Sequence, residues 1–255
     1  MSAHDVNPTD ALLRDISELE LWQHAAELAF AGYSVVPGVL SLSETASLRS
    51  RAMDLLTSAA GAEDLTRQRV GNVLRLDEAF LCVLADARVN TLLAAVLGDG
   101  VVLSSLQLQA VPVGALRDPG PAGQQFGLSP TGGAPWYATA TCCLNDWRQG
   151  RGTVEVVPGS HLVPPPAHQG AAEAHPVECT AGSVIVANGN LWRRFGPYDG
   201  RGSLPSVGVV AVHCRDFVTP RETYPELLAR LEAEGNPIAS LLGAGRTRPV
   251  PPWGT

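Results

Sequence analysis

Apolar residues in the first part of the chain, 1–98, recur every three or four positions. This period predicts amphipathic helices at 10–31, 43–58 and 81–97, because side chains at that spacing share one helix face. The last of them is expected to end at Gly98, since glycine readily adopts the left-handed backbone of a helix C-terminus. The first part of the chain is therefore predicted to be helical.

From residue 101 the period changes to two. The segment 101–111 alternates so that Gln107 and Gln109 lie on one face and leucines on the other, which predicts a strand. Further short strands are expected at 33–36, 136–144, 153–157, 183–188 and 207–214. A Gly/Pro-rich loop at 114–135 is longer than a simple connection requires, which is typical of a functional loop.

These elements predict a mainly β protein with flanking helices (α+β), built as a double-stranded β-helix, the jelly roll of cupin-like proteins. At 255 residues the chain is long enough to bury a sizeable core in one domain. We expect a helical part at 1–98, a β core at 99–217, and a C-terminal part at 218–255. The last part holds a helix at 220–234 and a Pro-rich tail.

The stretch 144–162, LNDWRQGRGTVEVVPGSHL, joins an apolar run to a polar turn and a short strand that ends in Pro158-Gly159-Ser160. It resembles the phytanoyl-CoA dioxygenase family of iron and 2-oxoglutarate oxygenases, in which an acidic turn, an Asn-Gly turn and a Val-Val-Pro-Gly-Ser-His corner follow in this order. Two further segments agree with the family in order, at 32–40 and 181–186. The likeness extends over roughly 25–217 and implies the same fold.

The resemblance also implies a metal site, and this chain departs from it. The family holds iron with a His-x-Asp motif and a distal histidine, and binds 2-oxoglutarate with a later arginine. Here Gly127 and Ser129 stand in the places of His and Asp, and Arg193 stands in that of the distal histidine. No basic residue lies within 202–212 for the cosubstrate, unless Arg201 takes that role. We therefore expect no metal ligands and no cofactor.

The alternation of side chains along the strands predicts which residues line the pocket in the absence of metal ligands. On the strand at 136–144, the polar alternation places Tyr137, Thr139, Thr141 and Cys143 inside, with Trp136, Ala138 and Ala140 packed outward. Gln107, Gln109, Val209, Ala211 and His213 are expected to line the same cavity. A barrel mouth with an apolar wall and a few polar groups is typical of a small-molecule site.

The candidate catalytic residues are Arg193, His213 and Tyr137. Arg193 offers a fixed cation for a developing oxyanion, and His213 or Tyr137 offers a proton. Candidate substrate-binding residues are Gln107, Gln109, Gln124, Thr139, Thr141 and Trp192.

Each of these has a structural alternative. Arg193 also fits a surface salt bridge, and His213 a hydrogen-bonded core histidine. Gln107 and Gln109 are also compatible with a strand face that is exposed to solvent. The side chains of Thr139 and Thr141 are also compatible with hydrogen bonding to backbone groups. His161 is expected to orient its turn. The remaining histidines are expected to be solvated: His4, His24, His168 and His175.

Composition narrows the functional classes. The net charge of −7 comes from 25 acidic and 18 basic residues, and all 18 are arginines, which argues against nucleic-acid binding and excludes a lysine Schiff base. No apolar run is long enough to span a bilayer and the N-terminus lacks a signal pattern, so we expect a cytoplasmic protein without a membrane partner. The five cysteines lack CxxC spacing, which favours free thiols over disulfides or zinc.

The leading hypothesis is a metal-independent, non-redox enzyme of the cyclase, isomerase or lyase type. It would act on a small organic intermediate in bacterial specialised-metabolite biosynthesis, a context that the resemblance implies. One alternative is an iron and 2-oxoglutarate oxygenase with atypical ligands such as His161, His213 or Asp199. Another is a non-catalytic pseudo-oxygenase that binds a ligand or partner enzyme, with the tail around Trp253 as a contact. A homodimer is compatible with each.

Overall fold

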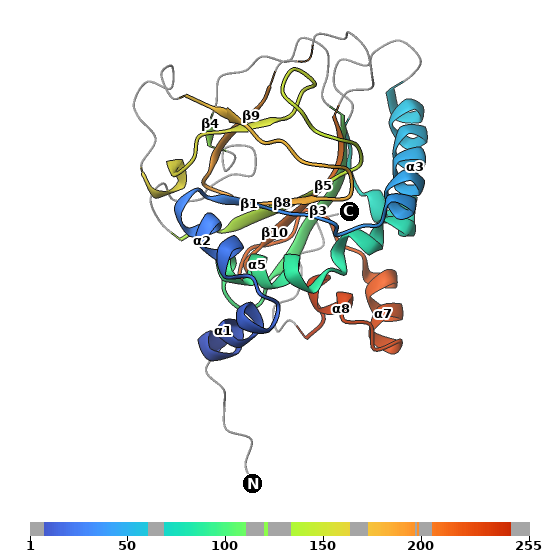
Figure 1. The fold of residues 1–255 in the computed structure, drawn as a ribbon. Helices are drawn as coiled ribbons and strands as arrows, with labels where there is room; N and C mark the ends of the chain where they lie inside the picture. Colours follow the sequence, from blue (N-terminus) through green and yellow to red (C-terminus); the bar gives the residue numbers. More distant parts are fainter. Residues whose placement is uncertain are drawn as a thin grey trace.

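Two antiparallel sheets face each other in the computed structural model (Figure 1). The model describes residues 8–60, 69–110, 120–121, 134–163, 173–196, 198 and 206–245. The larger sheet has the order β1-β8-β5-β10-β3-β2 and the smaller one β4-β9-β6-β7. The predicted mainly β architecture with flanking helices is confirmed.

The strands of the larger sheet are β1 (Tyr33–Val36), β2 (Arg69–Val70), β3 (Val102–Ala110), β5 (Tyr137–Cys143), β8 (Val184–Asn188) and β10 (Val207–Cys214). Those of the smaller sheet are β4 (Gly120–Pro121), β6 (Val154–Val156), β7 (His175–Pro176) and β9 (Trp192–Phe195). The five strands predicted after residue 100 agree with β3, β5, β6, β8 and β10 to within one residue at each end. Strands β2, β4, β7 and β9 were not predicted, since each has only two to four residues and shows no periodic pattern.

The helices and 3₁₀ segments are α1 (Pro8–Glu18), α2 (Trp22–Phe30), α3 (Leu42–Ala60), α4 (Val73–Leu76), η2 (Glu78–Leu84), α5 (Ala87–Leu97), η3 (Ser160–Leu162), α7 (Pro225–Ala233) and α8 (Ile238–Leu241). Two predicted helices are each divided. The helix expected at 10–31 breaks at Glu20, whose φ of 55° is left-handed. The one expected at 81–97 restarts at Asp86, whose carboxylate accepts the Val89 N–H as an N-cap.

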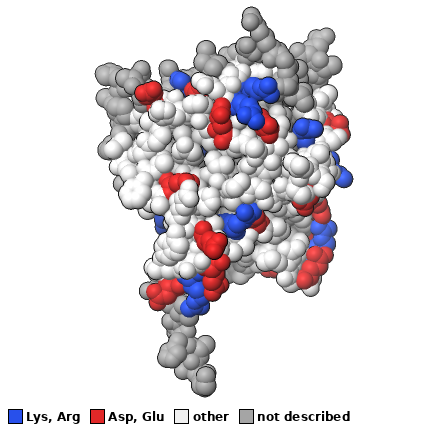
Figure 2. All heavy atoms as spheres, viewed as in Figure 1, with Lys and Arg blue, Asp and Glu red and all other residues white. Residues whose placement is uncertain are grey.

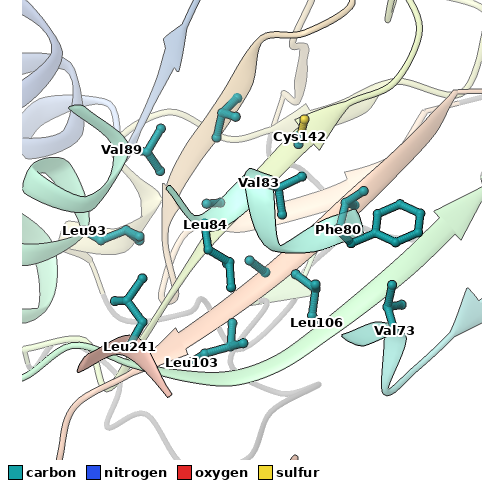
Figure 3. Packing of buried hydrophobic residues seen from close by; sticks show 14 of the residues in the cluster. Val73, Phe80, Val83, Leu84, Val89, Leu93, Leu103, Leu106, Cys142 and Leu241 are labelled. Atoms are coloured by element: carbon teal, nitrogen blue, oxygen red, sulfur yellow. The ribbon is translucent and has the colours of Figure 1, made fainter. Parts of the chain in front are cut away.

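These helices cover one face of the larger sheet and bury most of the core there (Figure 3). Phe80 and Leu84 of η2 pack over Leu103 and Leu106 of β3. Cys142 of β5 joins the same cluster. The opposite face of the sheet, which turns toward the smaller sheet, is therefore left for a different set of side chains.

Strand β3 is held along its free edge by a buried carboxylate. Glu222 accepts hydrogen bonds from the backbone N–H of Leu106 (2.8 Å) and of Asn72 (2.9 Å), and from the hydroxyl of Tyr224. Burying an unpaired N–H is costly, so these bonds stabilise the strand where the short β2 does not reach. Glu222 thereby fixes the position of the polar residues that β3 carries on its other face.

The surface charges are mixed and the cysteines are unpaired. Figure 2 shows acidic and basic side chains interspersed on the face that it draws, without a continuous basic stripe among the described residues. All five cysteines are free; Cys142, Cys143 and Cys214 are buried, and Cys82 and Cys179 are partly exposed.

No single helix in the described ranges is long and apolar enough to cross a bilayer. The bent pair η2 and α5 together has sufficient length and apolar composition, by those two criteria alone.

Replacing Glu222 by Gln puts an amide NH₂ where the carboxylate accepts three hydrogen bonds. We expect Glu222→Gln to lower the free energy of unfolding by about 2 kcal/mol, measured by urea denaturation. The exposed Glu226→Gln, on the first turn of α7, is the matched control and should change stability by less than about 0.5 kcal/mol. Equal stability of the two variants would show that Glu222 does not anchor β3.

Candidate functional site

The inner face of the larger sheet carries a band of polar residues. In the strand register, Ser105 of β3 and Thr139 of β5 lie opposite Val212 of the central strand β10. Gln107 and Thr141 lie opposite Val210 in the same way. Because paired residues share a face, all of these side chains point away from the helices and toward the smaller sheet. The predicted inward phase of the β5 threonines and the β3 glutamines agrees with this register.

The predicted inward position of Val209, Ala211 and His213 is wrong. His213 lies opposite Ala138 and Leu103, on the face that packs against the helices, and it is 1% exposed. Neither ring nitrogen has a hydrogen-bond partner of ordinary geometry among the described residues. Burial lowers the pKa of His213 to about 4, and the Ala211 backbone offsets this only in part. His213 is a neutral core residue, outside the inner face.

Arg193 reaches the inner face from the smaller sheet. On β9 it pairs with Val156, whose side chain lies in the apolar cluster between the sheets. Its Nη1 donates a 2.6 Å hydrogen bond to Oγ1 of Thr139, across to the larger sheet. Burial alone lowers the pKa of Arg193 to about 10, which still leaves it protonated at neutral pH.

No carboxylate pairs with Arg193 among the described residues. The salt bridge considered for it belongs instead to its neighbour: Arg194 Nε lies 2.6 Å from the carboxylate of Glu155, on the opposite face of β9 and β6. Burying a guanidinium without a counter-ion costs free energy, which such a residue recovers when it binds an anion. Arg193 is therefore the described cation best placed to meet a ligand.

The inner face is partly open to solvent at its centre. Val210 lies on the central strand of the larger sheet, yet its side chain is only partly buried, as are those of Gln109 and Arg193. Arg193 thus keeps some exposed surface, although protein atoms surround its guanidinium closely enough to lower its pKa. We call the partly exposed part of the inner face around Arg193 and Val210 the inner-face site. Gln107 and Thr141 flank Val210 on the neighbouring strands.

A second arginine, missed by the sequence analysis, contacts this band. Arg69 of β2 lies opposite Gln109 and donates through Nε to the side-chain oxygen of Gln107. The amide nitrogen of Gln107 in turn donates to Ser105 Oγ at 2.8 Å. Burial lowers the pKa of Arg69, with a smaller lowering by Arg221 and an opposing effect of Glu222.

The other predicted site residues are placed as follows. Tyr137 is buried at the end of the inner face, beside Val212 and Cys214. Burial, with a smaller contribution from Cys214, raises the pKa of Tyr137 against an opposing effect of Arg221, so its hydroxyl stays protonated at neutral pH. Trp192 alternates with Arg193 along β9 and therefore lies on the outer face, away from the inner-face site. Gln124 lies outside the described residues.

Two histidines hold the N-terminal helices to the sheets. His161 Nε2 donates to the carbonyl oxygen of Ala29 at 3.2 Å, which fits the expected structural role. His24 was expected to be solvated, and this is wrong: its Nδ1 lies 2.7 Å from Oγ of Ser34. Ser34 donates its proton to Glu27 at 2.5 Å, so it accepts from His24 and is not activated as a nucleophile. His175 is exposed as expected, and His4 and His168 lie outside the described residues.

The donor set among the described residues does not suit iron. In the part of the chain that the structure describes, no three His, Cys, Asp or Glu side chains come together as ligands. A protonated guanidinium takes the place of the distal histidine and has no lone pair to coordinate with. His161 and His213, considered as replacements, are hydrogen-bonded to α2 and buried behind the sheet respectively. Gly127, Ser129 and Asp199 lie outside the described residues.

A separate cavity of about 670 Å³ lies where α5, β3 and α8 meet. Its lining includes Asp99, Asp216 and Phe217, and none of the inner-face residues discussed above. We therefore treat it as independent of the candidate site.

Comparison with known proteins supports the fold. Residues 30–194 match the model of the phytanoyl-CoA dioxygenase (PhyH) family. No curated protein matches the sequence. Among solved structures, the chain is similar to the non-heme alpha-ketoglutarate-dependent epimerase SnoN from nogalamycin biosynthesis, with 22% identity, a TM-score of 0.61, and coverage of 78% of this chain and 84% of SnoN.

Two further solved structures are similar. The carbocyclase SnoK from the same biosynthesis has 18% identity and a TM-score of 0.60, over 82% of this chain and 90% of SnoK. HygX from Streptomyces hygroscopicus, whose structure has nickel and 2-oxoglutarate bound, has 17% identity and a TM-score of 0.62, over 78% of this chain and 89% of HygX. At these identities, the likenesses show the fold alone.

The two neighbouring arginines of β9 should respond oppositely to removal of charge. Arg193→Met removes a partly buried cation that has no described carboxylate partner, so we expect stability unchanged or raised by about 1 kcal/mol. Arg194→Met leaves the buried Glu155 unpaired and should cost about 2 kcal/mol. Chemical denaturation of both variants checks this. A loss at Arg193→Met as large as at Arg194→Met would mean that Arg193 is a structural cation.

The buried His213 predicts a pH dependence of stability. The unfolded chain binds a proton at this residue below about pH 6.5, whereas the folded protein does so only near pH 4. Stability should therefore fall as pH decreases through that window, by up to about 1.4 kcal/mol per pH unit from this residue. His213→Leu should flatten the profile and the exposed His175→Gln should not, as followed by thermal denaturation. An unchanged slope in His213→Leu would contradict the assignment.

Proposed function

Because the chain belongs to the phytanoyl-CoA dioxygenase family yet places an arginine where the distal metal ligand is expected, we propose that it is a metal-independent, non-redox enzyme. Its reaction is a cyclisation, isomerisation or related rearrangement of a small organic molecule that develops negative charge on an oxygen atom. One observation carries the proposal: the Arg193 guanidinium is enclosed between the sheets, bonded to Thr139 and without a described carboxylate partner.

Arg193 supplies the electrostatic part of the mechanism. A fixed cation that is enclosed by protein stabilises a developing enolate or alkoxide more than water does, because it does not have to reorient during the reaction. The bond to Thr139 holds the guanidinium toward the larger sheet. Removal of one such stabilising group commonly slows a reaction about a hundredfold or more.

Proton transfer is assigned to Tyr137. Its raised pKa keeps the phenol protonated at neutral pH, so it acts as a proton donor and not as a base. The partly exposed Val210 supplies an apolar surface that helps to hold one conformer of the substrate, and such orientation itself lowers a barrier by several kcal/mol. His213 has no part in this scheme, because it lies on the other face of the sheet.

The biosynthetic setting is inferred from the similar structures. SnoN and SnoK are an epimerase and a carbocyclase of nogalamycin biosynthesis. We infer a comparable role in a specialised-metabolite pathway, and a cytoplasmic location. Oxyanion stabilisation by Arg193 and proton donation by Tyr137 would then take the place of iron and 2-oxoglutarate.

The test is turnover of candidate pathway intermediates by purified protein with EDTA and without 2-oxoglutarate, compared with added Fe(II) and 2-oxoglutarate. We expect equal conversion in both and no succinate, because no step uses the metal. Arg193→Met should lower kcat/KM at least about tenfold, since it removes the oxyanion partner. The exposed Arg148→Met is the control and should keep parental turnover.

Two outcomes would contradict the proposal. Conversion that requires Fe(II) and yields succinate would identify an oxygenase with atypical ligands. Binding of intermediates or of a partner enzyme without any conversion would identify a pseudo-oxygenase.

A further inference from the structure

The hydrogen bonds around the inner-face site have a direction. Arginine has donors and no acceptor, so in the 2.6 Å contact the Thr139 oxygen accepts from Arg193. The hydroxyl proton of Thr139 is then free to be donated elsewhere. No described residue accepts it in the structure.

A second chain of hydrogen bonds runs in the same sense. Arg69 donates to the side-chain oxygen of Gln107, which fixes the orientation of the amide. The amide nitrogen of Gln107 then donates to Ser105 Oγ at 2.8 Å. The Ser105 oxygen accepts this bond, so its hydroxyl proton is also available, and again no described residue takes it.

The two hydroxyls occupy one row of the sheet. Ser105 and Thr139 both lie opposite Val212, on the strands either side of it. Strands are spaced about 4.8 Å apart, so their Cα atoms are separated by about 10 Å across that valine. Each hydroxyl is the last member of a chain that begins at an arginine, and hydrogen bonds in such chains polarise one another.

The charge of the neighbourhood agrees with this direction. Arg193 and Arg69 are cationic. Glu155, on the strand next to that of Arg193, lies on the outer face and is paired with Arg194. Glu222 acts on Arg69 and accepts its hydrogen bonds at the edge of β3. The inner-face polar residues described on β3 and β5 are hydroxyls and amides.

We propose that the inner-face site, where Arg193 and Thr139 present hydrogen-bond donors, takes an anion with acceptor oxygens: a carboxylate, or the enolate of a carbonyl compound. This inference rests on the proposed function, for which it names the substrate class. One oxygen is bound by Arg193 and Thr139. Ser105, about 10 Å away along the row, is left for a second acceptor group of a longer ligand. Amines and other cations are excluded as ligands. Their N–H donors would face the donors of the site, and their positive charge would be repelled by Arg193.

The experiment compares two probes of similar shape and opposite charge, benzoate and benzamidinium, at equal ionic strength in EDTA. Binding is followed by thermal shift and by isothermal titration. We expect benzoate to raise the melting temperature of the parent, and benzamidinium to leave it unchanged. Arg193→Met should weaken benzoate at least tenfold, and Thr139→Val several-fold. Arg148→Met, which removes an exposed charge, should bind benzoate like the parent.

Equal binding of the two probes, no shift with either, or benzoate binding that is unaffected by Arg193→Met would each overturn the inference. Because the titration needs no turnover, its result is separate from the test of the proposed function. If the protein binds benzoate but not benzamidinium and its turnover requires iron, the proposed function is refuted and the anion site is retained. If it binds both probes equally and its turnover resists EDTA, the anion site is refuted and the proposed function is retained.

Discussion

The contact between Arg193 and Thr139 joins the two sheets through a cation that no described carboxylate neutralises. Desolvating a guanidinium is unfavourable, and one hydroxyl recovers only part of that cost. The arrangement is maintained because packing elsewhere stabilises the fold, mainly between the helices and the outer face of the larger sheet. The inner face can then carry groups that are poor for stability and suited to binding.

This division of labour follows from the two faces of a strand. On β5, Ala138, Ala140 and Cys142 pack under the helices, while Thr139 and Thr141 face the smaller sheet. Glu222 holds β3 from its edge, so that Gln107 and Ser105 are presented in register with the threonines. If either strand slipped by one residue, its apolar side chains would turn to the inner face and its polar side chains would turn to the helices. The hydrogen bonds of Glu222 and the helix packing both oppose such a slip.

The fold was predictable because the order of short motifs, such as the turn at Pro158-Gly159-Ser160, is specific even where periodicity is weak. The position of Arg193 between the sheets was predictable because it replaces a residue at a known point of such a motif. His213 was misplaced since β10 is apolar on both faces, with Val207, Val209 and Val212 all fully buried, so its alternation carries no sign of which face is inward. Arg69 was missed because β2 has only two residues, and its pairing with β3 is a long-range contact.

The central claim is that the guanidinium of Arg193 occupies the place between the sheets where the family binds its metal ion. Its most direct test is anaerobic titration of the protein with Fe(II), with and without 2-oxoglutarate, followed by desalting and measurement of the iron retained per chain. The account predicts far less than one equivalent under both conditions. Retention of one equivalent of iron, increased by 2-oxoglutarate, would contradict it.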